Sequence, residues 1–196
     1  MKKILIINAH PSQKSFVTAL ADAYQRGAQQ AGYEVQRIDV GNLHFNPNLA
    51  AGYEAITPLE PDLIKAQAAI TWCTHLVITT PLWWMDFPAV MKGFLDRVLL
   101  PGFAFKYHRP RFGLIPQWDK LLRGRSGRII YTQGEQQWLM RTYLADGVWR
   151  NWKHRVIGFA GFWPLRRTVF SAADVAPDTK KQKWLKQVYR LGKRGA

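Results

Sequence analysis

The stretch KILIINAHPSQKSF, residues 3–16, decides the fold of this 196-residue chain. Residues 3–9 form an apolar, β-branched run, which predicts a buried strand. His10 and Pro11 end that run, and Ser15 has the type of side chain that caps a helix N-terminus. A buried strand that passes through a short loop into a helix is the opening unit of an α/β domain.

The same alternation continues to the end of the chain. Further strands are predicted at residues 33–40, 75–80, 128–132 and 165–171, and helices at residues 15–31, 61–74, 88–98, 138–159 and 177–194. Residues 41–61 and 99–125 are expected to be irregular. Strands that alternate with helices run parallel and are joined by right-handed crossovers. The sequence therefore predicts a single α/β domain over residues 1–196, with a doubly wound, five-stranded parallel sheet and helices on both faces.

Charge and cysteine content narrow the class of protein. The formal net charge is +15, which is typical of proteins that meet phosphorylated ligands, nucleic acid or an anionic surface, although a solvated basic face explains it equally well. No RNP, KH or zinc-finger pattern occurs, so nucleic acid is not an expected partner. The one cysteine, Cys73, is expected to be an inert buried thiol. Without a disulfide, a signal-peptide core or a membrane-length apolar run, the expected location is cytoplasmic.

The loop after the first strand, residues 10–15, carries the elements of a phosphate site. In a doubly wound sheet, ligands bind beyond the carboxyl ends of the strands. This loop supplies two hydroxyls, Lys14 and the free N–H groups of a helix start. It lacks the GxGxxG pattern, which disfavours a dinucleotide site of the usual kind. Plain helix capping by Ser15, with Lys14 solvated, is the alternative.

The loop after the third strand, residues 81–88, is crowded with large apolar side chains. Trp83, Trp84, Met85 and Phe87 would be costly to leave exposed at the end of a strand. They suit the wall of a pocket for a planar ligand, with main-chain groups bonding its polar edge, and Trp84 is expected against the ligand or at the pocket mouth. A hydrophobic subunit interface is the alternative, and the two are compatible.

The loop after the fourth strand gives a weaker signal. Thr132, Gln133 and Gly134 allow a heterocycle to approach closely, although an ordinary strand-to-helix turn has the same composition. No CxxC, HExxH or acidic cluster is present, so a metal site is not expected.

Taken together, these loops resemble those of the flavodoxin-like NAD(P)H:quinone oxidoreductases, the family of DT-diaphorase, the drug-activity modulators and the ancillary flavoproteins of potassium-efflux systems. The most specific piece is PLWW at residues 81–84 followed by FPAVMKGFLDRV at residues 87–98. Residues 6–11, 15–16, 45–47, 61–67, 102–105 and 159–162 also fit.

The resemblance implies a bound flavin, FMN or FAD, with NAD(P)H as co-substrate and a quinone-type acceptor. His10, Ser15, Phe16 and Val17 would hold the phosphate and ribityl chain. The isoalloxazine would lie against a wall made of Pro81, Leu82, Trp83, Trp84 and Met85, and its polar edge would contact Thr132, Gln133 and Gly134. The short chain and the single phosphate loop favour FMN.

One departure concerns the fourth-strand loop, where the family usually has Thr-Thr-Gly-Gly and then a tyrosine and a histidine that assist hydride transfer. Tyr131 and Gln133 replace the first Thr and the first Gly here, and Tyr143 and His154 are the candidates for the two assisting residues. The substitution also motivates an alternative function, a regulatory flavoprotein subunit in peripheral contact with a membrane transporter.

A homodimer is the expected assembly. The resemblance implies it, and residues 81–105 concentrate more apolar surface than one flavin covers. The side chains expected in that patch are Trp83, Trp84, Met85, Phe87, Phe94, Leu99, Leu100, Phe103 and Phe105. A two-fold pairing would bury both copies of it.

Overall fold

Five parallel strands form the central sheet of the computed structural model, which describes residues 1–55, 57–108 and 117–196. Their order is β2-β1-β3-β6-β7, with β2 at one edge. After β2 the chain crosses to the other side of β1, where β3, β6 and β7 are added in turn, so the topological switch point lies between β1 and β3. The bounds are β1 Lys3–Asn8, β2 Glu34–Asp39, β3 His75–Pro81, β6 Ser126–Gln133 and β7 Leu165–Ser171. This order confirms the predicted doubly wound sheet.

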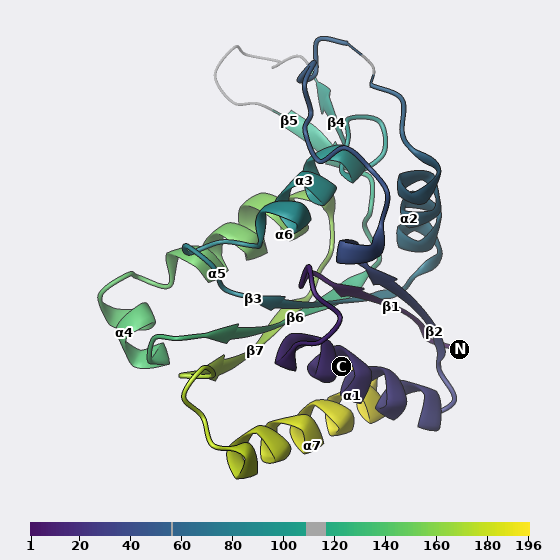
Figure 1. Ribbon diagram of the computed structural model, residues 1–196. Helices are drawn as coiled ribbons and strands as arrows, with labels where there is room; N and C mark the ends of the chain where they lie inside the picture. Colours follow the sequence, from purple (N-terminus) through teal and green to yellow (C-terminus); the bar gives the residue numbers. More distant parts are fainter. Residues whose placement is uncertain (56, 109–116) are drawn as a thin grey trace.

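Helices cover both faces of the sheet (Figure 1). On one face α1 (Phe16–Gln30) lies beside α7 (Asp178–Arg194). The other face carries α2 (Pro61–Trp72), α3 (Ala89–Val98), α5 (Gly147–Asn151) and α6 (Ile157–Ala160), while α4 (Gln137–Thr142) follows the carboxyl end of β6. Each face has its own apolar core, because the strands are buried on both sides.

Helix α1 begins and ends as its sequence predicts. The Ser15 Oγ accepts the N–H of Thr18 at 3.0 Å, which caps the helix. Gly32 follows the last turn with a φ of +80°, a conformation that glycine adopts without strain. These two signals fix where the first strand-loop-helix unit places its helix N-terminus.

The predicted irregular stretch at residues 99–125 contains two strands, which corrects that expectation. Strand β4 (Phe105–His108) pairs antiparallel with β5 (Gln117–Lys120), and the part of the prediction at residues 109–116 lies outside the described residues. Both strands are four residues long and largely polar. Phe105 is the one buried residue in these two strands. The sequence therefore has no clear alternation of apolar and polar residues that would predict them.

The helical material expected over residues 138–159 is present, in several pieces. The segment is divided into α4, α5, a π-helical turn η2 (Trp152–Val156) and α6. Ala145 and Asp146 adopt positive φ angles between α4 and α5, which ends the first helix. The apolar spacing of this segment fits one helix or several in a row, so it did not reveal the breaks.

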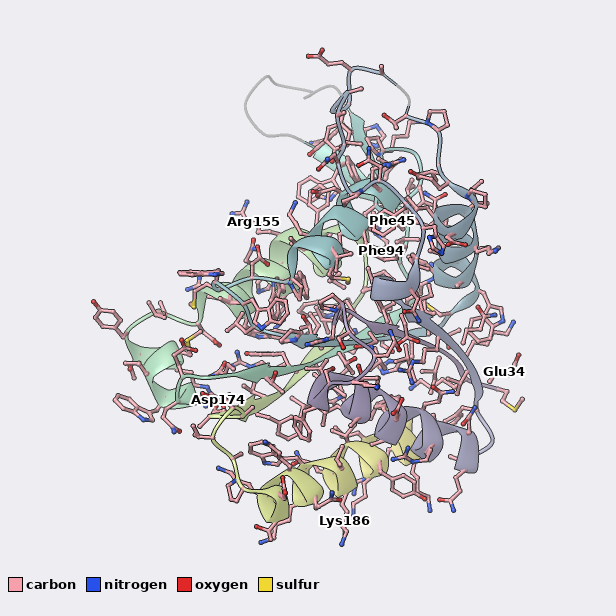
Figure 2. All side chains as sticks on the ribbon, viewed as in Figure 1. Glu34, Phe45, Phe94, Arg155, Asp174 and Lys186 are labelled. Atoms are coloured by element: carbon pink, nitrogen blue, oxygen red, sulfur yellow. The ribbon has the colours of Figure 1, made fainter. Side chains whose placement is uncertain are left out.

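The apolar patch expected at residues 81–105 is smaller than predicted. Phe87, Phe94 and Phe105 are buried in the core, and Phe94 packs edge-to-face on Phe45 with ring centroids 6.2 Å apart (Figure 2). The large apolar side chains of this stretch that remain exposed are those of Trp83, Trp84 and Met85.

Cys73 is buried, as predicted, and burial raises the pKa of its thiol to about 11. Among the described residues, the helices are all too short or too polar to cross a lipid bilayer.

Candidate functional site

A cavity of about 350 Å³ opens at the carboxyl edge of the sheet. Its lining comes from the loops after β1, β3, β6 and β7: His10, Ser15, Phe16, Val17, Pro81, Leu82, Trp83, Thr132, Gln133, Gly134, Ala173 and Asp174. The structure therefore brings together every binding residue predicted from the sequence except Trp84 and Met85. Figure 2 shows Asp174 at this edge of the sheet.

The loop after β1 is held in shape by its own polar groups. The N–H of Ser12 donates to His10 Nδ1 at 2.9 Å, and the Thr18 hydroxyl donates to the carbonyl of Ser12 at 3.1 Å. The main-chain N–H groups of Phe16 and Val17, the first two residues of α1, have no hydrogen-bond acceptor among the described residues. Free N–H groups at the positive end of a helix dipole form an anion site.

The loop after β3 is a tight turn from Trp83 to Asp86. Main-chain hydrogen bonds join these two residues in both directions, at 3.0 and 3.1 Å. Between them, Trp84 and Met85 have φ angles of 49° and 63°, which non-glycine residues adopt only when the surroundings hold them there.

Asp86 and Trp152 supply that support. Asp86 Oδ1 accepts the N–H of Phe87 at 2.8 Å and the indole N–H of Trp152 at 2.9 Å. The buried Trp152 ring also stacks on Phe87, with centroids 4.2 Å apart. The π-helical turn, which the sequence did not predict, thus fixes the wall of the cavity through a side chain far along the chain.

The two tryptophans of the turn have different surroundings. Trp83 lines the cavity and meets His10 edge-to-face at 5.4 Å. Trp84 is fully exposed, at 100% of its reference area, and neither it nor Met85 lines the cavity. The expected place of Trp84, against a bound ligand or at the pocket mouth, stays a prediction, since the cavity lining does not include this side chain.

The loop after β6 closes the opposite wall. The N–H of Leu82 donates to the carbonyl of Thr132 at 2.7 Å, which joins this loop to the preceding one. The Gln133 amide donates to the Glu135 carbonyl at 3.0 Å and the Ser171 hydroxyl at 3.2 Å. A Cβ on Gly134 would have open space around it, so a ligand can approach the main chain here.

Ala173 and Asp174 line the cavity although the sequence analysis did not name them. They follow β7, and the carboxyl end of every parallel strand reaches the same edge of the sheet. Applying this rule to the loop after the fifth strand as well would have predicted Ala173 and Asp174 as lining residues.

Tyr143 and His154, the candidates for assisting hydride transfer, are exposed and do not line the cavity as the described residues form it. Tyr131, in place of the family threonine, is buried with its ring edge-on to Trp152, and burial raises the pKa of its hydroxyl.

A larger cavity, of about 470 Å³, lies over α3 and α6 rather than at the strand ends. Its walls are mainly apolar. Lys92 and Asp96, which also line it, form a salt bridge of 2.6 Å with each other. This cavity lies away from the carboxyl ends of the strands, where ligands bind in a doubly wound sheet, so the smaller cavity is the better candidate for a site that holds a phosphorylated ligand.

Comparisons with known proteins agree with this geometry. A family model described as "Flavodoxin-like fold" matches residues 2–193. A Haemophilus influenzae protein described as an uncharacterized NAD(P)H oxidoreductase is 39% identical over 108 residues, which cover 52% of this chain and 52% of that protein. The chain thus spans about half of that relative.

A second relative and a solved structure match over more of the chain. NAD(P)H dehydrogenase (quinone) 1 of Rattus norvegicus is 27% identical over 93% of this chain and 73% of its own length. The structure of an FMN-dependent NADH-azoreductase of Bacillus anthracis, in complex with FMN, covers both chains fully, with a TM-score of 0.72 and 19% identity. At that identity the structural likeness is one of fold.

Proposed function

The chain belongs to the flavodoxin-like fold family, and from that premise we propose that it is a flavin-dependent oxidoreductase that passes a hydride from NAD(P)H to a quinone-type acceptor. The names of its relatives support the reductase class and the quinone-type acceptor. The oxidoreductase names do not favour the alternative of a regulatory subunit for a transporter.

The cavity at the carboxyl edge of the sheet fits a flavin mononucleotide. The N–H groups of Phe16 and Val17, with the capping Ser15, suit one phosphate. Leu82 and Trp83 offer an apolar wall for a flat ring. A volume of about 350 Å³ is at the small end of ligand pockets, which supports FMN over the larger FAD.

A bound flavin would supply the redox chemistry, by accepting two electrons and a proton as hydride and passing them on. The protein's own residues bind and orient. Thr132, Gln133 and Gly134 line the cavity and would contact the polar edge of the ring, where negative charge develops on reduction. The braced Trp83–Asp86 turn keeps one wall in place, so that the donor and then the acceptor stack in the same orientation.

The convergence of the loops after β1, β3 and β6 on one cavity carries this proposal. Steady-state turnover tests it: FMN-reconstituted protein should oxidise NADH or NADPH only when a soluble quinone is added in excess. The Gly134→Val variant, whose side chain would fill the open space beside the main chain, should lose most of this turnover. Flavin-loaded protein that leaves every quinone and both nicotinamides unchanged would refute the activity.

A further inference from the structure

Helix α7 presents a continuous row of positive charge to solvent. Its members, the basic face, are Lys183, Lys186, Arg190, Lys193 and Arg194, and all five are exposed. Their spacing of three or four residues puts them on one side of the helix. Figure 2 shows Lys186 pointing away from the sheet. The buried residues Val188 and Gly192 belong to the opposite side, which packs on α1.

The basic face has no internal counter-charge. Among the described residues, none of its five side chains forms a salt bridge or hydrogen bond. The one acidic residue of α7 is Asp178, in the first turn, and Asp22 of α1 is already paired with Arg37. Like charges three or four residues apart destabilise a helix by a small amount each. Lys193 and Arg194, in the last turn, complement the helix dipole, but Lys183, Lys186 and Arg190 gain no such stabilisation.

The basic face belongs to a layer of two helices. Helices α1 and α7 lie side by side (Figure 1), and their backbones approach closely where Gly27 meets Tyr189 and Gly192 meets Tyr24. Arg26 of α1 is exposed and adds positive charge to the same layer. A helix that reads DNA lies in the major groove, whereas α7 packs closely on α1.

The layer also lacks stacking groups and anchors. Among the described residues of α1 and α7, no large hydrophobic or aromatic side chain is exposed. Single-stranded nucleic acid is bound on exposed aromatic rings, and inserted amphipathic helices carry exposed apolar side chains. A basic surface with neither is complementary to a plane of mobile negative charges.

We propose that the basic face of α7 docks the protein reversibly on anionic phospholipid surfaces. The contact is electrostatic, without insertion, so it is released by salt. None of the five residues of the basic face lines the cavity at the carboxyl edge of the sheet. The proposal does not depend on which reaction the cavity supports.

Vesicle co-sedimentation of the whole protein tests it. One variant combines Lys183→Gln, Lys186→Gln and Arg190→Gln. A matched control combines Lys106→Gln, Arg123→Gln and Arg150→Gln, three exposed basic residues on other parts of the surface. Both lose three positive charges, so net charge alone affects them equally. Circular dichroism and thermal unfolding establish that both fold.

At about 0.1 M salt the wild-type protein and the control should sediment with vesicles of phosphatidylcholine containing one-third phosphatidylglycerol, and not with pure phosphatidylcholine. The α7 variant should bind the anionic vesicles about 10- to 100-fold more weakly, since each basic residue near an anionic surface strengthens binding several-fold. Equal weakening of both variants, no binding by the wild type, or tighter α7-dependent binding to a DNA duplex than to the vesicles would overturn the proposal.

Discussion

At the scale of single residues, the adjacent side chains of Trp83 and Trp84 have different surroundings because they lie in a tight turn. Trp83 lines the cavity and is 45% exposed, whereas Trp84 lies wholly in solvent. Aromatic stacking on a flat heterocycle contributes roughly 1–3 kcal/mol in nucleic-acid systems, and a flavin ring has a similar face.

Trp83→Ala should therefore weaken FMN binding by about tenfold or more, which corresponds to about 1.4 kcal/mol. Trp84→Ala, the matched neighbour, should change FMN affinity in a dilute, monomeric sample by less than about threefold. Fluorescence titration of FMN measures both. A larger loss for Trp84 than for Trp83 would place the ring on the other side of the turn.

A second residue-scale prediction concerns His75, which is buried at the amino end of β3. Burial, and then the charges of Lys2, Arg128 and Arg166, lower the pKa of its imidazole to about 3. The unfolded chain, with a pKa of 6.5, binds the proton first as the pH falls. Stability is thus present in full above pH 6.5 and is lost progressively toward pH 3.

Between pH 7 and pH 5 this linkage should cost about 2 kcal/mol of unfolding free energy. The variant His75→Asn has no ring to protonate, so its stability should decline less over that interval by a similar amount. Urea denaturation at each pH measures the difference. Parallel curves for the wild type and the variant would mean that His75 is not buried in its neutral form.

At the scale of elements, α1 and α7 depend on two glycines. A Cβ at Gly192 would clash with the carbonyl oxygen of Tyr24, and one at Gly27 with that of Tyr189. Both clashes are with main chain, which moves only if the helices separate.

Gly192→Ala should destabilise the protein by about 1–3 kcal/mol, despite the better helix propensity of alanine. Gly147→Ala is the control, because a Cβ there meets open space at the start of α5. Thermal unfolding should lower the midpoint for the first and leave the second near the wild-type value. An unaffected Gly192→Ala would show that the helices are less closely packed than described.

The elements also show what the sequence could and could not predict. Strands β1, β3 and β6 were predicted because they contain apolar runs between turn residues, and β2 because apolar and polar residues alternate in it. The short strands β4 and β5 and the break between α4 and α5 were not, since they rest on pairing and backbone angles that no local pattern reveals.

The candidate site also has features that the sequence could predict and features that it could not. Its loops could be located from strand order alone, and so could most of the cavity lining. The outward direction of Trp84 and the contact between Asp86 and Trp152 could not, because both depend on a turn geometry and a tertiary partner distant in sequence.

At the scale of the whole molecule, we propose a homodimer. Exposed Trp84, Met85, Trp138 and Tyr143 all belong to segments that follow β3 or β6 at the carboxyl edge of the sheet. A two-fold pairing there would cover these side chains and close each cavity with a partner's residues. The basic face of α7 would have to lie away from this pairing, because two like-charged faces repel each other.

Sedimentation equilibrium at micromolar concentration should give a dimer, and Trp84→Glu combined with Tyr143→Glu should give a monomer. Lys65→Glu combined with Lys106→Glu, charge changes at exposed positions elsewhere, should leave the dimer intact. A wild-type monomer with full, concentration-independent turnover would contradict a shared site.

The central claim is that the cavity after β1, β3 and β6 binds FMN, and a fluorescence titration of the purified protein with FMN tests it most directly. The expected result is saturable binding of one equivalent per chain, weakened by Trp83→Ala and unaffected by the charge variants of α7. Absence of saturable binding by folded wild-type protein, even at high micromolar FMN, would contradict the account.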